Sequence, residues 1–206
     1  MNPGSIATNN ARTLRTLLVR AAYYLFLTSG IAGLTYAGYV FVDARNFQAR
    51  EQAAFAESLA KNASGDEASH LLIEGGVIGE MEVPRLGLKA IVVHGDSPAI
   101  LQSAVGHLPG TALPGEAGNV ALAGHRDTFF RPLRNIQSGD AITFRTLDGE
   151  FRYQVESTTV VPPSDISSLR SLGGRTLTLI TCFPFYYVGA APDRFIVRAR
   201  QVETWP

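Results

Sequence analysis

The chain carries no charged residue from Ala21 to Val42, and this uncharged run restricts what it can fold into more than any other feature. A helix over the run would be about 33 Å long, whereas the hydrocarbon core of a bilayer is about 30 Å thick. No polar side chains mark an outer face, so a buried helix of a soluble domain is disfavoured. The run therefore predicts a transmembrane helix over residues 21–42.

The charges that flank this run predict its orientation. Arg12, Arg15 and Arg20 precede it, and no acidic residue occurs before Asp43. Because basic residues stay on the cytoplasmic side, residues 1–20 are expected in the cytoplasm and everything after the helix outside it. A cleaved secretory signal is the alternative, but such signals have apolar cores of only about 7–15 residues. We therefore expect an uncleaved signal anchor in a single-pass protein of the cell membrane.

Small residues recur at four-residue spacing in the predicted membrane helix, at Ser29, Gly33 and Ala37. This spacing lets two membrane helices approach each other closely. Small residues are also common in membrane helices that do not associate. The pattern therefore predicts no more than a weak homodimer.

The composition changes twice after the membrane helix. Residues 43–75 are rich in Ala, Glu, Gln, Asn and Ser with little apolar periodicity, which predicts a helical juxtamembrane stalk. Residues 76–206 consist of short β-favouring runs separated by Gly, Pro, Asn and Asp. This length is sufficient for one hydrophobic core and too short for two.

Eight strands are predicted in the second region, and their number and shortness favour a closed or nearly closed, antiparallel-rich β-barrel over a βαβ arrangement. Short helical turns are expected over residues 98–102 and 128–133. The fold class is therefore mostly β, with one membrane helix and a stalk in front of the barrel. The predicted strands cover residues 77–83, 88–93, 104–107, 119–125, 141–145, 151–161, 176–182 and 194–202.

Charge and motifs argue against several classes of function. Lys plus Arg and Asp plus Glu number 18 each, so no net positive field favours nucleic acid. The sequence has no nucleotide-binding glycine motif, and its histidines and carboxylates lack the spacing of a metal site. With 1 cysteine, the chain has no internal disulfide. We expect neither a cofactor nor a metal.

Three chemically capable residues stand at the ends of predicted strands. Cys182 closes the apolar run from Thr178, His125 ends the strand over residues 119–125, and Arg194 opens the last strand. Side chains at strand ends can converge on a cleft without disturbing the core. A lone cysteine in an apolar strand is more often a buried small side chain, and His107 is a rival to His125.

These residues carry a resemblance to a known family. Thr178-Leu179-Ile180-Thr181-Cys182 resembles the TLxTC signature of sortases, Gly124-His125-Arg126 resembles the segment that holds their histidine, and Arg194 stands where their arginine follows the cysteine strand. The resemblance extends from about Val77 to Val202 and implies an eight-stranded β-barrel. The region from Gly106 to Arg134 is most like class D sortases.

The resemblance implies a cysteine transpeptidase at the cell surface. Cys182 would attack an LPxTG-like sorting signal near the C-terminus of a protein substrate, and an amine of a peptidoglycan precursor would resolve the thioester. His125 would serve as general acid and base, and Arg194 would stabilise the oxyanion. Thr181 and Ile180, next to Cys182 in the motif, would contact the substrate.

Two other classes of function remain open on the sequence alone. One is a membrane-anchored cysteine endopeptidase whose thioester is hydrolysed, and the other is a surface binding barrel in which Cys182 is a core residue. An L,D-transpeptidase is a distant third, because its cysteine and histidine lie close together in a Ser-His-Gly-Cys-like run that this chain lacks.

Overall fold

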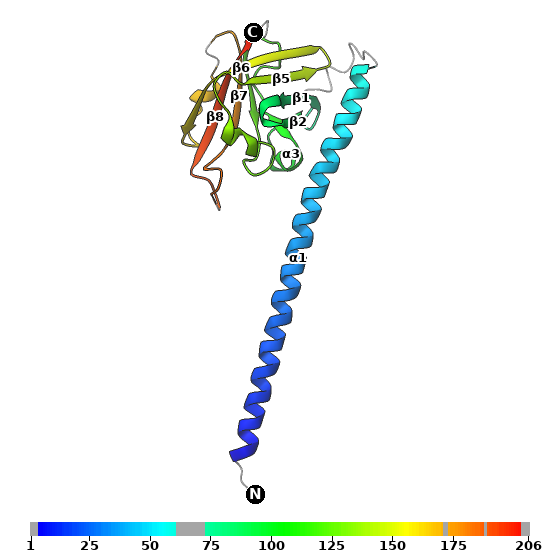
Figure 1. The fold of residues 1–206 in the computed structure, drawn as a ribbon, viewed down its shortest axis with the longest axis vertical. Coiled ribbons are helices and arrows are strands. Elements are labelled where there is room, and N and C mark those ends of the chain that lie inside the picture. The colour runs from blue at the N-terminus through cyan, green and yellow to red at the C-terminus, as the bar shows by residue number, and fades with distance from the viewer. Residues whose placement is uncertain (1–3, 61–72, 171–172, 188, 203–206) are drawn as a thin grey trace. The chain divides into compact units, whose positions relative to one another are not determined.

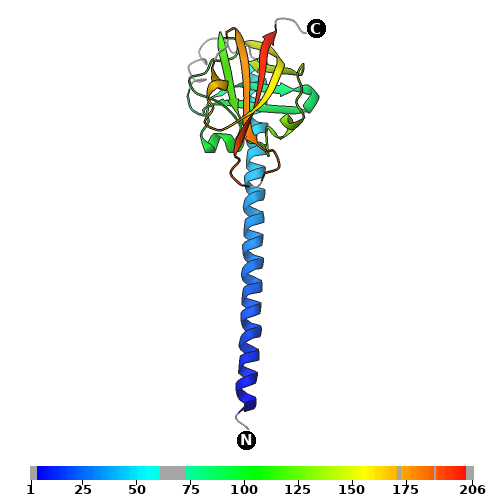
Figure 2. The same ribbon diagram turned by 90° about the vertical axis from the view of Figure 1, so that its left-hand side faces the viewer.

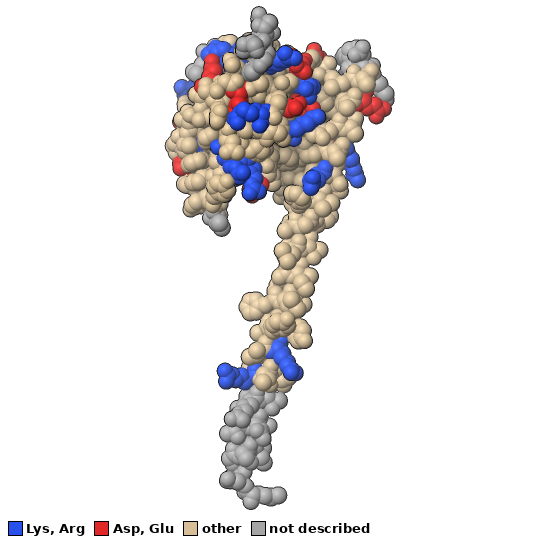
Figure 3. Space-filling view, viewed as in Figure 1, with Lys and Arg blue, Asp and Glu red and all other residues tan. Residues whose placement is uncertain are grey.

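A computed structural model describes residues 4–60, 73–170, 173–187 and 189–202, and it divides the chain into two compact units, Met1–Asp43 and Ala44–Pro206. The helix α1 runs over Gly4–Ala60 and therefore contains the whole predicted membrane segment. Among the described helices, α1 is the one long and apolar enough to cross a membrane. Figure 3 shows basic side chains near its described start, followed by a stretch without charges.

The prediction of a helical stalk is met by α1 as far as Ala60, where the helix ends. The rest of the predicted stalk up to residue 72 lies outside the described residues. The predicted boundaries between cytoplasmic segment, membrane helix and stalk do not coincide with any break in α1, so they remain predictions.

Eight strands form a closed barrel in the order β1-β2-β3-β4-β7-β8-β6-β5, which confirms the predicted fold class (Figures 1 and 2). Most neighbours are antiparallel, but β2 with β3 and β4 with β7 are parallel. The strands are β1 (Val77–Val83), β2 (Leu88–His94), β3 (Val105–His107), β4 (Gly118–Ala123), β5 (Ala141–Thr146), β6 (Gly149–Val161), β7 (Arg175–Phe183) and β8 (Asp193–Val202).

The short helices lie in the connections between strands. They are η1 (Pro84–Leu86), α3 (Pro98–Ser103), η2 (Arg131–Asn135) and η3 (Ser167–Leu169). The helical turn predicted over residues 98–102 is present as α3, whereas the one predicted over 128–133 begins later, at Arg131. Pro132 explains the shift, because proline is favoured in the first turn of a helix.

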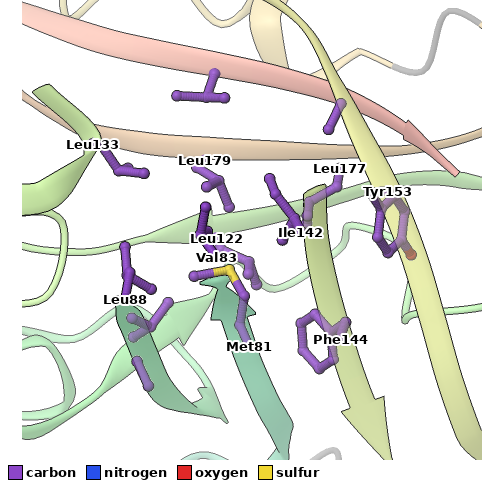
Figure 4. Close-up of a cluster of buried hydrophobic side chains, with 14 of the residues drawn as sticks. Met81, Val83, Leu88, Leu122, Leu133, Ile142, Phe144, Tyr153, Leu177 and Leu179 are labelled. Atoms are coloured by element: carbon purple, nitrogen blue, oxygen red, sulfur yellow. The ribbon is translucent and has the colours of Figure 1, made fainter. Parts of the chain in front are cut away.

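Alternating side chains fill the barrel. In β5, Ile142, Phe144 and Thr146 are buried, and the residues between them are partly exposed, as the two-residue period of a strand requires. Figure 4 shows side chains from strands around the barrel meeting in one core, including Met81, Leu122, Leu177 and Leu179. This core fixes β4 and β7 relative to each other, and with them the residues at their ends.

The last part of α1 belongs to the second unit and packs on the outside of the barrel. Phe55 is 8 % exposed and joins a cluster with Ile91, Val93 and Ala104. Gln48 binds two backbone groups, since its Nε2 donates to the Ser103 carbonyl at 2.8 Å and its Oε1 accepts from the Ile91 N–H at 2.8 Å. The pairing of β2 with β3 begins one residue later, at Val92. Gln48 therefore provides the hydrogen-bond partner that the Ile91 N–H would otherwise lack at this edge of β2.

This packing predicts that residues 44–60 contribute to the stability of the barrel. Phe55→Ala removes a buried ring and is expected to lower the free energy of unfolding by about 3 kcal/mol. Leu59→Ala is the matched control on the same helix, because Leu59 is 37 % exposed and its truncation should cost less than about 1 kcal/mol. Denaturant unfolding of the full chain in detergent, followed by circular dichroism of the β-barrel, measures both. Equal effects of the two variants would contradict the packing.

Candidate active site

The register of three neighbouring strands places the predicted trio in one row. In the parallel pair of β4 and β7, Gly118 lies opposite Arg175 and Ala123 opposite Ile180, so continuing the register two residues brings His125 to the level of Cys182. In the antiparallel pair of β7 and β8, Cys182 lies directly opposite Arg194. Residues directly opposite each other point to the same face of a sheet. The strand order β4-β7-β8 therefore sets histidine, cysteine and arginine side by side.

Hydrogen bonds beyond β4 keep the histidine segment against β7. The Gly124 N–H donates to the Ile180 carbonyl at 3.1 Å, and the Thr181 hydroxyl donates to the Gly124 carbonyl at 2.7 Å. A Cβ at Gly124 would lie 2.9 Å from the Phe130 ring, so glycine is required for this close approach. The predicted strand through His125 ends earlier, at Ala123, and His125 begins the loop that follows.

The two residues predicted to contact substrate lie differently from the trio. Thr181 is 2 % exposed, and its hydroxyl is already bound to Gly124, while Ile180 is partly exposed. Neither lines the cavity described next. The contacts indicate that Thr181 positions the segment before His125, and direct substrate contact by either residue stays a prediction.

A cavity of about 310 Å³ opens at these strand ends. It is lined by His125, Cys182 and Arg194, by Arg126 and Asp127, and by residues 189–191 of the connection between β7 and β8. His125 is exposed, while Cys182 and Arg194 are half-buried. The structure therefore brings the whole predicted trio to one cavity, and it adds Arg126 and the β7–β8 connection, which the sequence reasoning did not single out.

The Arg194 guanidinium is held beside the cysteine by backbone carbonyl groups. Its Nη1 donates to the Asp193 carbonyl at 3.0 Å and to the Ala191 carbonyl at 3.4 Å. A guanidinium stays charged at any physiological pH. The cavity therefore contains a permanent cation on β8, the strand next to that of Cys182. A cation held there can stabilise an anion that forms in the cavity.

His107, the alternative candidate for the catalytic histidine, is buried and hydrogen-bonded away from the cavity. His107 is 1 % exposed, its Nε2 lies 3.0 Å from both the Ala112 carbonyl oxygen and Thr111 Oγ1, and its Nδ1 lies 3.2 Å from Nδ1 of His94. In the described part of the chain, no group of three or more His, Cys, Asp or Glu side chains has a metal-binding arrangement. His107 therefore serves the packing of β3 and the turn after it.

Burial of His107 predicts that the barrel loses stability in acid. Desolvation is the main cause that lowers the pKa of His107 below its ordinary value of 6.5, with a smaller contribution from His94, against the Ala112 carbonyl, which acts to raise it. Below 6.5 the unfolded chain binds this proton more readily than the folded chain does, so the free energy of unfolding falls as pH falls through that range.

Unfolding titrations of the wild type and of His107→Gln at a series of pH values test this linkage. The wild type is expected to lose stability as the pH falls from about 7 to about 5. The variant should show a shallower dependence, whatever its absolute stability. Parallel curves for the two proteins would contradict the assignment.

Comparisons with known proteins agree with this fold and site. The family model of the sortase domain matches residues 81–202. Sortase D of Bacillus subtilis is 32% identical over 186 residues, covering 83% of this chain and 94% of the relative. The structure of a Clostridium perfringens sortase D5 transpeptidase superposes with a TM-score of 0.61 at 27% identity, covering 77% of this chain and 97% of that one.

Sortases of another class are also similar. The crystal structure of sortase C1 from Streptococcus agalactiae matches with a TM-score of 0.58 at 32% identity, covering 63% of this chain and 69% of that chain. The chain belongs to the sortase family, and the predicted resemblance to class D is confirmed. Sortases are cysteine transpeptidases, so the chain is an enzyme of this general kind.

Proposed function

We propose that this sortase is anchored in the cell membrane, cleaves an LPxTG-like sorting signal and transfers the acyl part to an amine of the cell wall. The observation that carries the proposal is the convergence of Cys182, His125 and Arg194, from three neighbouring strand ends, on one cavity. Each residue supplies a different requirement of acyl transfer: a nucleophile, a proton donor and acceptor, and a cation for the oxyanion.

In the first step, the Cys182 thiolate attacks the carbonyl carbon of the scissile amide. The carbonyl oxygen becomes an oxyanion, which hydrogen bonds from the permanently charged Arg194 guanidinium stabilise. Protonated His125 gives its proton to the leaving amine as the carbon–nitrogen bond breaks. The products are a thioester on Cys182, neutral His125 and the released C-terminal fragment of the substrate.

In the second step, an amine takes the place of the leaving group. Neutral His125 accepts a proton from the incoming amine as its nitrogen attacks the thioester, and Cys182 leaves as a thiolate. The new amide joins the acyl part to the acceptor, and the enzyme returns to its starting protonation state. Water attacking in place of the amine would give hydrolysis, which is the reaction of the endopeptidase alternative.

The helix α1 suits an enzyme that works next to a membrane. The uncharged run from Ala21 to Val42 is the proposed anchor, and the arginines before it support a cytoplasmic N-terminus. The barrel would then stand on the outer side, where exported proteins and peptidoglycan precursors meet. A reporter enzyme fused at either end of the chain tests this orientation.

Mass spectrometry of the full chain in detergent tests the proposed chemistry. Incubation with an LPxTG-like peptide is expected to add the mass of the acyl fragment to the protein, at the peptide that contains Cys182, and hydroxylamine should remove it, as it does a thioester. Added amine should convert the released product from the acid to the amide. If no sorting-signal peptide acylates the protein, the proposal is wrong; if amine never enters the product, the endopeptidase reading replaces it.

A further inference from the structure

Arg126, the residue after His125, fastens the connection between β7 and β8. This connection, residues 184–192 with 188 outside the described residues, is called the β7–β8 loop below. Nη2 of Arg126 donates to the Tyr187 carbonyl at 2.7 Å and to the Gly189 carbonyl at 3.0 Å. The guanidinium carbon also lies 6.0 Å from the centre of the Tyr187 ring. One side chain therefore joins the loop to the end of β4, across more than 60 residues of sequence.

The loop is held at other points by arginines that do not replace this contact. Arg194 binds the Ala191 carbonyl near the far end of the loop, and Arg134 of η2 lies 5.5 Å from the centre of the Tyr186 ring. The first comes from β8, which continues directly from the loop, and the second contacts the loop through the Tyr186 ring, with no hydrogen bond to the described residues of the loop. Arg126 is thus the residue that hydrogen-bonds the loop to the segment carrying His125.

The hydrogen bonding of the Arg126 guanidinium is incomplete, which is unfavourable for the stability of the folded protein. Its Nη1 is buried and has no hydrogen-bond partner among the described residues. A buried charged donor without a partner costs free energy of the same order as a charge-assisted hydrogen bond contributes, so the two offset each other. An unpaired buried group in a native structure calls for an explanation, and a functional role is one. The contribution of this guanidinium to global stability is therefore small, although its effect on the position of the loop is direct.

We propose that Arg126 is a positioning residue for acyl transfer: it holds the β7–β8 loop as the wall of the cavity that faces His125 and Cys182. The inference rests on the proposed function. Residues 189–191 of the loop line the same cavity as His125 and Cys182, so their position affects how the thioester and the incoming amine lie relative to each other. Displacement of reacting groups by about 1 Å can cost about 100-fold in rate, without any change to the reacting residues themselves.

The proposal predicts a separation between the reactivity of the thiol and the turnover of peptide. Arg126→Gln removes the positive charge and leaves one NH2 group as the donor. It is expected to lower kcat/KM for an LPxTG-like peptide by about 10- to 100-fold. The rate at which a small methanethiosulfonate reagent modifies Cys182 should change much less than kcat/KM does, because the side chains of Cys182, His125 and Arg194 are all still present. The fraction of thioester lost to water rather than to amine should rise, since a displaced wall admits solvent.

Arg126→Lys is the conservative variant and Arg131→Ala the matched control. An ammonium can donate to both the Tyr187 and Gly189 carbonyls, so Arg126→Lys should recover part of the activity that Arg126→Gln loses. Arg131 is an exposed arginine five positions along the chain, and it has no hydrogen bond to the loop among the described residues. Its replacement should leave unchanged the peptide-cleaving activity, the division of the thioester between amine and water, and the rate of thiol modification. Melting temperatures of all three variants are expected within about 4 °C of the wild type.

The outcomes separate this inference from the proposed function. A wild-type protein that forms no thioester would overturn the proposed function, and the inference would fall with it. A wild type that forms thioester, with Arg126→Gln equal to it in kcat/KM and in partition, would overturn the inference alone. Parallel losses of kcat/KM, thiol modification and melting temperature in Arg126→Gln would also overturn it, because they would mark a residue needed for folding.

Discussion

Replacing Cys182 by alanine is expected to abolish thioester formation and to lower kcat/KM for a sorting-signal peptide by at least about 10⁴-fold. The reason is that no other residue in the cavity can take over. Its remaining side chains are an imidazole, two guanidiniums and a carboxylate, together with glycine and alanine. None of these attacks an amide as readily as a cysteine thiolate does. The initial rate of peptide cleavage and the intact mass of the protein measure the two parts of the prediction.

The fold of the variant serves as its control. Cys182 is half-buried at the end of β7, so loss of its sulfur leaves the core and both strand pairings intact, and the unfolding curve of Cys182→Ala should overlay that of the wild type. The binding-barrel reading makes the opposite prediction for activity: the wild type would already be inactive, and Cys182→Ala would differ from it only in stability.

The architecture of the barrel was predictable from the sequence because its strands are short and bounded by turn residues. The first predicted strand coincides with β1, and the others differ from the observed strands by a few residues at their ends. The end of β4 could not be placed from the sequence, because no proline or turn-forming pair separates Ala123 from His125, whereas the structure ends the strand at Ala123. The parallel pairing of β4 with β7 is also a property of the whole fold rather than of either strand.

The site was predictable where chemistry is local and unpredictable where it depends on loops. The trio could be named from strand ends and from the resemblance to sortases, and the structure brings its members to one cavity. Arg126 belongs to the Gly124-His125-Arg126 motif, but the motif does not reveal its role, because that role depends on carbonyl groups more than 60 residues away in the sequence. The burial of Thr181 likewise depends on the parallel pairing of β7 with β4, because the Thr181 hydroxyl reaches the Gly124 carbonyl just beyond the end of β4.

Removing the imidazole of His125 is the second change from which a large loss of activity is expected. His125→Ala is expected to lower kcat/KM by about 10²- to 10⁴-fold, because the leaving amine then departs without a proton donor and the incoming amine attacks without a base. His125 is exposed at the mouth of a cavity of about 310 Å³, so imidazole from solution has room to enter. Added imidazole should therefore restore part of the activity of this variant and none of that of Cys182→Ala.

The pH dependence separates the two duties of this histidine. With the wild type, acylation requires a thiolate together with a protonated imidazole, so its single-turnover rate should pass through a maximum and decline at high pH. In His125→Ala the decline at high pH should disappear, because no proton on residue 125 remains to be lost. His94→Gln is the control, as His94 lies outside the cavity and contacts His107, and it should keep the wild-type profile. A wild-type rate that rises without limit as the pH is raised would assign the proton of the leaving amine to water, and would leave His125 the role of base alone.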